Sequence, residues 1–160
     1  MTGWRGFLGY ALLFWLAAVS QQALAPSLAW GAVRPDFLLV VSLVLSIQAR
    51  TTGALTLGFV AGVIQGALAG ANLTHYVLSR VGAGAALAGL KSLGIEVSGL
   101  MAGVLVAAGT VVAQILLMFL APPGAILPFL GATIGTALYN GVLGALLHAL
   151  LKRFISPRSV

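Results

Sequence analysis

Two histidines and two carboxylates are the side chains in this chain of 160 residues that are best suited to bind a metal ion or to transfer a proton. His75 and His148 fall near opposite boundaries of predicted membrane-spanning helices, so we expect no shared metal site. The sequence contains no carboxylate pair, no nucleophile next to a base and no glycine loop followed by lysine, and it has no cysteine. We therefore expect no cofactor, no metal and no enzymatic activity.

The composition indicates that the solvent of this chain is lipid. Charged residues make up 6% of the chain, whereas soluble domains carry about 25%. Apolar runs of roughly 20 residues, the length that a bilayer requires, are bounded by single cations. Long runs without strict alternation favour helices over a barrel. The net charge of +6 comes from dispersed cations rather than a basic face, so we expect no nucleic-acid partner.

The pattern predicts an all-α polytopic membrane protein, a single bundle of six transmembrane helices that forms one domain over residues 1–160. The expected spans are residues 6–25, 35–49, 53–70, 73–90, 97–121 and 125–151. In a five-span alternative, residues 73–90 lie flat on the membrane and the basic C-terminus is outside.

The distribution of cations predicts that both termini lie in the cytoplasm. Arg34 is then the one cation outside, and Arg80 falls within a span. Trp4 and Trp30 would lie at opposite interfaces, which suits indole rings. The cations on the inner side are Arg5, Arg50, Lys91, Lys152, Arg153 and Arg158.

The first span also has features of a cleavable signal peptide, because Ala23-Leu24-Ala25 resembles a small-residue cleavage site. Pro26 would directly follow the cut. We therefore expect the first span to be retained.

Glycines recur at four-residue spacing on three of the predicted spans. This spacing stacks them along one helix face, where another backbone can approach closely. Two interpretations stay open, packing within the bundle and a groove for a transmembrane helix of a partner. The residues concerned are Gly58, Gly62, Gly66 and Gly70, then Gly99 and Gly103, then Gly131 and Gly135.

Arg80 is the charged residue that lipid should reject. It lies roughly 10 Å from the outer end of its span at 1.5 Å per residue, a depth from which the side chain can snorkel to the interface. The alternative is a buried pair or a ligand contact, with Asp36 as the acidic candidate on that side. Asp36 also follows Pro35 in the first turn of a predicted helix, where it complements the helix dipole.

Polar side chains also occur at regular spacing within the predicted spans. Thr133, Thr136 and Asn140 share one face of the last span, with His148 two turns further on. Gln65 and Gln114 are isolated amides in other spans. We expect these groups to form hydrogen bonds between helices.

Two segments resemble a known family. Residues 34–41 read Arg-Pro-Asp-Phe-Leu-Leu-Val-Val, and residues 58–65 read Gly-Phe-Val-Ala-Gly-Val-Ile-Gln. They resemble the rod shape-determining protein MreD, whose members carry a similar helix start and a similar glycine stretch. Gly66 stands where the family usually has an acidic residue. The family motif and an outer cleft are then expected to use Arg34, Pro35, Asp36, Gln65, Arg80 and Asn140.

The resemblance implies a non-enzymatic, multi-pass scaffold of the bacterial cytoplasmic membrane that maintains rod shape. Its implied partners are MreC, a single-span protein, and other proteins of the cell-wall elongation machinery, and the oligomeric state stays open. MreD-like proteins are also similar in fold to the substrate-binding S-components of vitamin transporters, which gives the alternative function. A vitamin pocket would then have a rim of Trp30, Asn72, His75, Tyr76 and Arg80. Against this, the first span lacks the A-x-x-x-A docking pattern of S-components.

Overall fold

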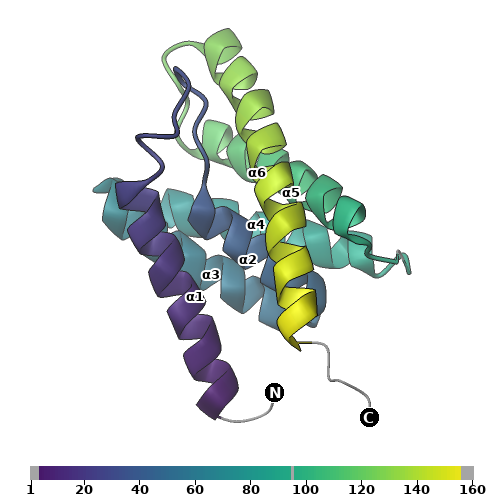
Figure 1. Cartoon of the computed structure of the whole chain (residues 1–160). Coiled ribbons are helices and arrows are strands. Elements are labelled where there is room, and N and C mark those ends of the chain that lie inside the picture. The colour runs from purple at the N-terminus through teal and green to yellow at the C-terminus, as the bar shows by residue number, and fades with distance from the viewer. Residues whose placement is uncertain (1–3, 95, 156–160) are drawn as a thin grey trace, which may run out of the picture.

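The computed structural model describes residues 4–94 and 96–155, and the side chains of 6–94 and 96–153. Over these ranges the chain forms six α-helices and no strand, as predicted (Figure 1). The helix boundaries differ from the predicted ones by a few residues. The helices are α1 (Trp4–Ala23), α2 (Phe37–Gln48), α3 (Thr51–Ala69), α4 (Leu73–Lys91), α5 (Gly99–Leu120) and α6 (Ile126–Ile155).

Three of the described helices, α3, α5 and α6, are long and apolar enough to cross a membrane. This is compatible with a membrane-embedded protein, although six such helices were expected. The helix α2 is apolar but has only 12 residues. The other two are more polar, since α1 carries Ser20-Gln21-Gln22 in its last turn and α4 carries His75 and Arg80.

The short helix α2 is the centre of the fold, because it packs against all five other helices. Every residue from Leu38 to Ile47 is buried. The helix follows Pro35 and is capped by Asp36, whose carboxylate oxygen accepts the N–H of Leu39 at 3.0 Å. The expected place of Asp36 at a helix N-terminus is therefore confirmed.

Three glycines on one face of α3 bring α3 and α4 into close contact. A β-carbon at Gly58 would lie 2.5 Å from the carbonyl oxygen of Arg80, and one at Gly62 would lie 2.5 Å from the α-carbon of Val77. Gly66 meets Leu73 in the same way at 2.9 Å. The two helices therefore run antiparallel, backbone against backbone.

Gly70 does not belong to this contact face. It ends α3 with a φ of 58°, a left-handed conformation that glycine adopts without strain, and it is exposed. Gly70 therefore ends the helix and does not pack against another helix of the chain, and its contact with a partner helix stays a prediction.

The remaining predicted glycines divide into two groups. Gly103 lies against α6, where a β-carbon would be 2.8 Å from the carbonyl oxygen of Gly141. At Gly135 a β-carbon would be 2.5 Å from a methyl group of Val33, in the connection between α1 and α2. Gly99 and Gly131 have open space beside them, so neither packs inside the chain.

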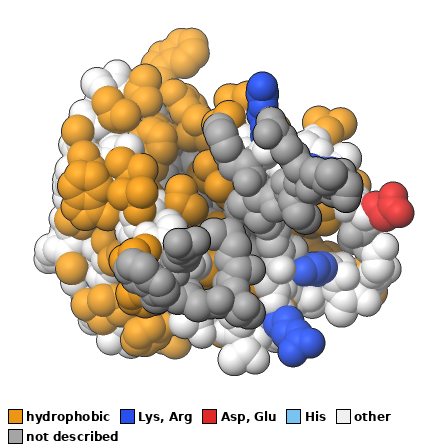
Figure 2. Space-filling model, turned by 60° about the horizontal axis from the view of Figure 1, so that its bottom comes forward, with side chains coloured by type: hydrophobic (Ala, Val, Ile, Leu, Met, Phe, Trp, Pro, Cys, Tyr) orange, Lys and Arg blue, Asp and Glu red, His pale blue; other side chains and the backbone are white. Residues whose placement is uncertain are grey.

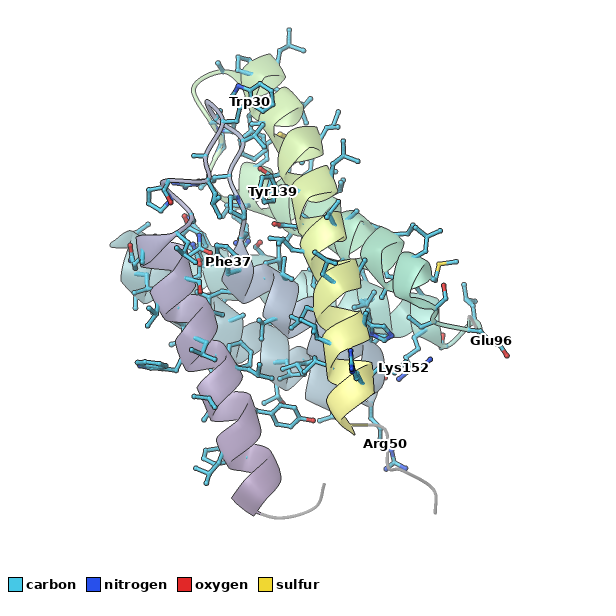
Figure 3. The ribbon with its side chains drawn as sticks, viewed as in Figure 1. Trp30, Phe37, Arg50, Glu96, Tyr139 and Lys152 are labelled. Carbon is cyan, nitrogen blue, oxygen red and sulfur yellow. The ribbon has the colours of Figure 1, made fainter. Side chains whose placement is uncertain are left out.

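The two ends of the bundle differ in charge. Trp30 lies at one end and Arg50 and Lys152 lie toward the other (Figure 3). The first turn of α1 and the last turn of α6 also lie toward the Arg50 end (Figure 1). Figure 2 turns this end toward the viewer and shows blue basic side chains among the other atoms. Arg158, predicted for the same side, lies outside the described residues.

Candidate functional site

A buried ion pair joins α4 to the start of α2. The guanidinium of Arg80 donates to the carboxylate of Asp36, and the two side chains are 2% and 9% exposed. Arg80 therefore does not reach the membrane interface by snorkelling, and the alternative of a buried pair with Asp36 is the one that the structure shows. Close packing of α4 on α3 brings Arg80 near Asp36, and a desolvated guanidinium is stabilised far better by a carboxylate than by lipid.

Neighbouring groups of α4 and α5 support the guanidinium. A second nitrogen of Arg80 donates to the hydroxyl of Ser79 at 3.0 Å, and this hydroxyl donates to the carbonyl oxygen of Ala113 at 2.7 Å. The guanidinium carbon also lies 5.5 Å from the centre of the Tyr76 ring, within the range of a cation–π contact. These contacts hold Arg80 in one orientation.

Asn140 links the ion pair to α5 and α6. Its carbonyl oxygen accepts the backbone N–H of Asp36 at 2.9 Å, and its amide donates to the hydroxyl of Thr110 at 3.2 Å. Thr110 in turn donates to the carbonyl oxygen of Val106 at 2.8 Å. The expected interhelical hydrogen bonding of Asn140 is confirmed, and Asp36 becomes a junction of α2, α4 and α6.

The segment before α2 is held by side chains rather than by secondary structure. The Gln21 side chain accepts the N–H of Phe37 at 2.8 Å and donates to the carbonyl oxygen of Pro35 at 3.5 Å. The N–H of Arg34 donates to the hydroxyl of Thr136 at 3.5 Å. Backbone groups of this non-helical segment thus find partners on α1 and α6, which a chain in lipid requires.

A cavity of about 490 Å³, here called the polar cavity, lies beside the ion pair. A second cavity of about 400 Å³ adjoins it, and both are lined by Gln21, Gly31, Arg34, Gln65 and Tyr76. The polar cavity is completed by Ala32, Pro35, Asp36, Arg80, Gln114, Leu117, Pro128, Phe129, Ala132, Thr133 and Thr136.

Two buried polar atoms at this cavity have no hydrogen-bond partner among the described residues. They are the side-chain oxygen Oε1 of Gln65 and the nitrogen Nε of Arg80. The interhelical hydrogen bond expected for Gln65 is therefore not made by its oxygen. In a native structure each unpaired buried group calls for an explanation, because leaving it unpaired is unfavourable.

The predicted rim of a vitamin pocket is assembled only in part. Tyr76 and Arg80 line the polar cavity, whereas Trp30 is 88% exposed and lines a different groove on α6. Asn72 caps α4 through the N–H of Thr74, and His75 does not line the cavity. Among residues 4–94 and 96–155, no three metal-ligating side chains come together.

Sequence reasoning missed three residues that build this site, namely Gln21, Ser79 and Thr110. Each makes a hydrogen bond to a residue that lies at least 14 positions away in the sequence. Their positions in the sequence could have indicated two of them, because Gln21 ends an apolar run and Ser79 precedes the one arginine within a predicted span.

Comparisons of the chain with models of protein families, with curated proteins and with solved structures gave no match. Its function is therefore inferred from its residues and their geometry.

Proposed function

We propose that this chain is a non-enzymatic membrane scaffold of the bacterial cell-wall elongation machinery, similar to MreD. It would bind a single-span protein like MreC through its helices and help to hold wall-synthesis proteins together. In this proposal the chain crosses the cytoplasmic membrane six times, with both termini in the cytoplasm. The six crossings would include α2, in which the residues from Leu38 to Ile47 are buried by the other helices.

One observation carries the proposal, which is the position of the segment that resembles MreD. Pro35 and Asp36 start the central helix, and Asp36 binds α4 by its side chain and α6 by its backbone. Pro35 and Asp36 are therefore used to assemble the bundle. This use fits a protein whose task is to hold a defined shape for partners.

The charge distribution supports the proposed orientation. The exposed side chains of Arg50, Lys152 and Arg153, together with Lys91, belong to one end of the bundle. Basic residues favour the cytoplasmic side of a membrane. The polar cavity, which lies at the start of α2, would then open toward the outside.

Exposed apolar faces are available for partner helices. On α1 the side chains of Phe7, Leu12 and Trp15 are 72%, 56% and 61% exposed. Association in lipid depends on close packing rather than on burial from water. Binding of a partner should therefore depend on the shape of such a face and only weakly on salt.

Purification from a rod-shaped bacterial host in mild detergent tests the scaffold function. Recovery of a stoichiometric single-span partner, and rounding and widening of cells on depletion, are the expected results. Cells that keep their rod shape after depletion, combined with no recovered partner, would contradict the proposal.

The polar cavity favours a second candidate, a substrate-binding S-component of a vitamin transporter. Its volume of about 490 Å³ lies within the range of about 300–1,000 Å³ usual for ligand pockets. A vitamin requirement on depletion, with cell shape unchanged, would favour this candidate over the scaffold.

A further inference from the structure

The two adjoining cavities provide room for a small molecule between α1, α3, α4, α5 and α6. They measure about 490 Å³ and about 400 Å³ and share Gln21, Arg34, Gln65 and Tyr76 among their lining residues. Arg34 therefore stands where the two spaces meet. A molecule in the polar cavity would contact side chains from most of the bundle.

The charges that line the polar cavity sum to +1. Arg80 is neutralised by Asp36, whose other carboxylate oxygen is occupied by the N–H of Leu39. The second acidic residue of the chain, Glu96, lies in the connection between α4 and α5, away from the cavity (Figure 3). Within the part of the chain that the structure describes, the charge of Arg34 thus has no carboxylate partner. A cavity with low-dielectric walls strengthens the attraction of such a cation for an anion.

Two unpaired polar atoms at the cavity lack hydrogen-bond partners: one needs a donor and the other needs an acceptor. Oε1 of Gln65 can only accept a hydrogen bond, and Nε–H of Arg80 can only donate one. Both atoms are buried, and both residues line the cavity. A ligand that satisfies Gln65 must therefore bring an O–H or N–H group.

Part of the lining of the cavity is apolar, namely Leu117 of α5 and Pro128, Phe129 and Ala132 of α6. The cavity thus combines cationic and amide groups with aromatic and aliphatic ones. This combination suits an organic molecule better than an inorganic ion.

We infer that the polar cavity binds a small organic carboxylate with a single negative charge, at least one O–H or N–H donor and an apolar portion. The carboxylate pairs with Arg34, the O–H or N–H group donates a hydrogen bond to Gln65, and the apolar portion lies against Phe129. This inference names the ligand class for the second candidate function, on which it rests, and it is independent of the scaffold function.

The test uses the full chain in nanodiscs of zwitterionic lipid, so that no anionic lipid competes for the cavity. The probes are N-acetyl-L-phenylalaninate, which has all three features, its uncharged amide N-acetyl-L-phenylalaninamide, and 3-phenylpropanoate, which lacks the N–H. Isothermal titration calorimetry measures their affinities. Loss of a charge-assisted hydrogen bond weakens binding by roughly tenfold or more, so the first probe should bind at least that much more tightly than the amide. Loss of the neutral hydrogen bond to Gln65 should weaken the binding of 3-phenylpropanoate by roughly two- to tenfold.

Two variants test whether the first probe binds beside Arg34. Arg34→Gln should weaken the first probe by roughly tenfold, whereas Arg50→Gln, at the other end of the bundle, should leave its affinity unchanged. Both arginines are exposed, so both variants are expected to fold, which thermal unfolding checks. Equal binding of the acid and the amide, equal binding by the Arg34→Gln protein, or no saturable binding at millimolar probe would overturn the inference. Partner recovery and cell shape are scored separately, so a negative titration leaves the scaffold proposal standing.

Discussion

Replacing Asp36 by Asn removes the negative charge that faces Arg80 but keeps a side-chain oxygen that can cap α2. Because Arg80 is 2% exposed, the variant leaves a guanidinium buried without a counter-charge. Breaking a buried ion pair by removing one partner usually costs about 3–5 kcal/mol. The pair borders the polar cavity, through which water can reach it, so we expect the Asp36→Asn variant to lose about 3 kcal/mol from its free energy of unfolding, the low end of that range.

Equilibrium unfolding by SDS in mixed micelles, followed by far-UV circular dichroism, measures this loss. The double variant Asp36→Asn with Arg80→Met removes the stranded charge as well, and it should recover most of the lost stability, because no uncompensated charge then remains buried. Arg153→Met is the matched control, since Arg153 is exposed at the end of α6. Its change should stay within about 0.5 kcal/mol.

Two results would refute this reasoning. One is a loss of less than about 1 kcal/mol for Asp36→Asn, which would match an exposed pair rather than a buried one. The other is a double variant as unstable as the single one. In that case the cost would come from the side chain of Asp36 itself and not from the uncompensated charge.

Three further outcomes follow from the structure. Gly62→Leu must enter space in which a β-carbon already lies 2.5 Å from the backbone of α4, so it should lose at least about 1–3 kcal/mol in the same SDS titration, whereas Gly131→Leu, with open space beside it, should not. Asn140→Leu leaves a buried backbone N–H at the start of α2 without an acceptor, and its expected loss in that titration is about 1–3 kcal/mol. In the proposed topology, a Cys at Ser27 is labelled by an impermeant maleimide on intact cells and a Cys at Ser92 only after permeabilisation; the reverse pattern would exclude that topology.

The helices were predictable because their ends carry local signals. Asp36 after Pro35 marks the start of α2, and Asn72 starts α4 by accepting the N–H of Thr74. Such capping depends on residues two or three positions apart, so the sequence alone displays it. The number of membrane crossings does not follow from local signals alone. Neighbouring helices cover a short helix such as α2, whereas hydropathy reflects only the residues of the helix itself.

The candidate site was predictable only as a set of alternatives. Arg80 and Asp36 are 44 positions apart, and the depth of Arg80 in its helix is compatible with snorkelling and with pairing. Glycine spacing has the same limit: it fixes the face of a helix but not what covers it, so Gly62 packs on α4 while Gly131 has open space. The cavity could not be read from the sequence, because it is formed by parts of five helices that only the fold brings together.

The shortness of α2 has an electrical consequence for a bilayer that contains this protein. At 1.5 Å per residue its 12 residues extend about 18 Å, whereas the hydrocarbon core of a bilayer is about 30 Å thick. In the proposed topology, the remaining depth on its N-terminal side would be taken up by residues 24–36 and by the polar cavity, beside the exposed Arg34. Water in this cavity would carry the external potential inward, so the membrane voltage would fall over a shorter path around α2. The local electric field there would be roughly 1.7 times that of the surrounding lipid, by the ratio of these two lengths.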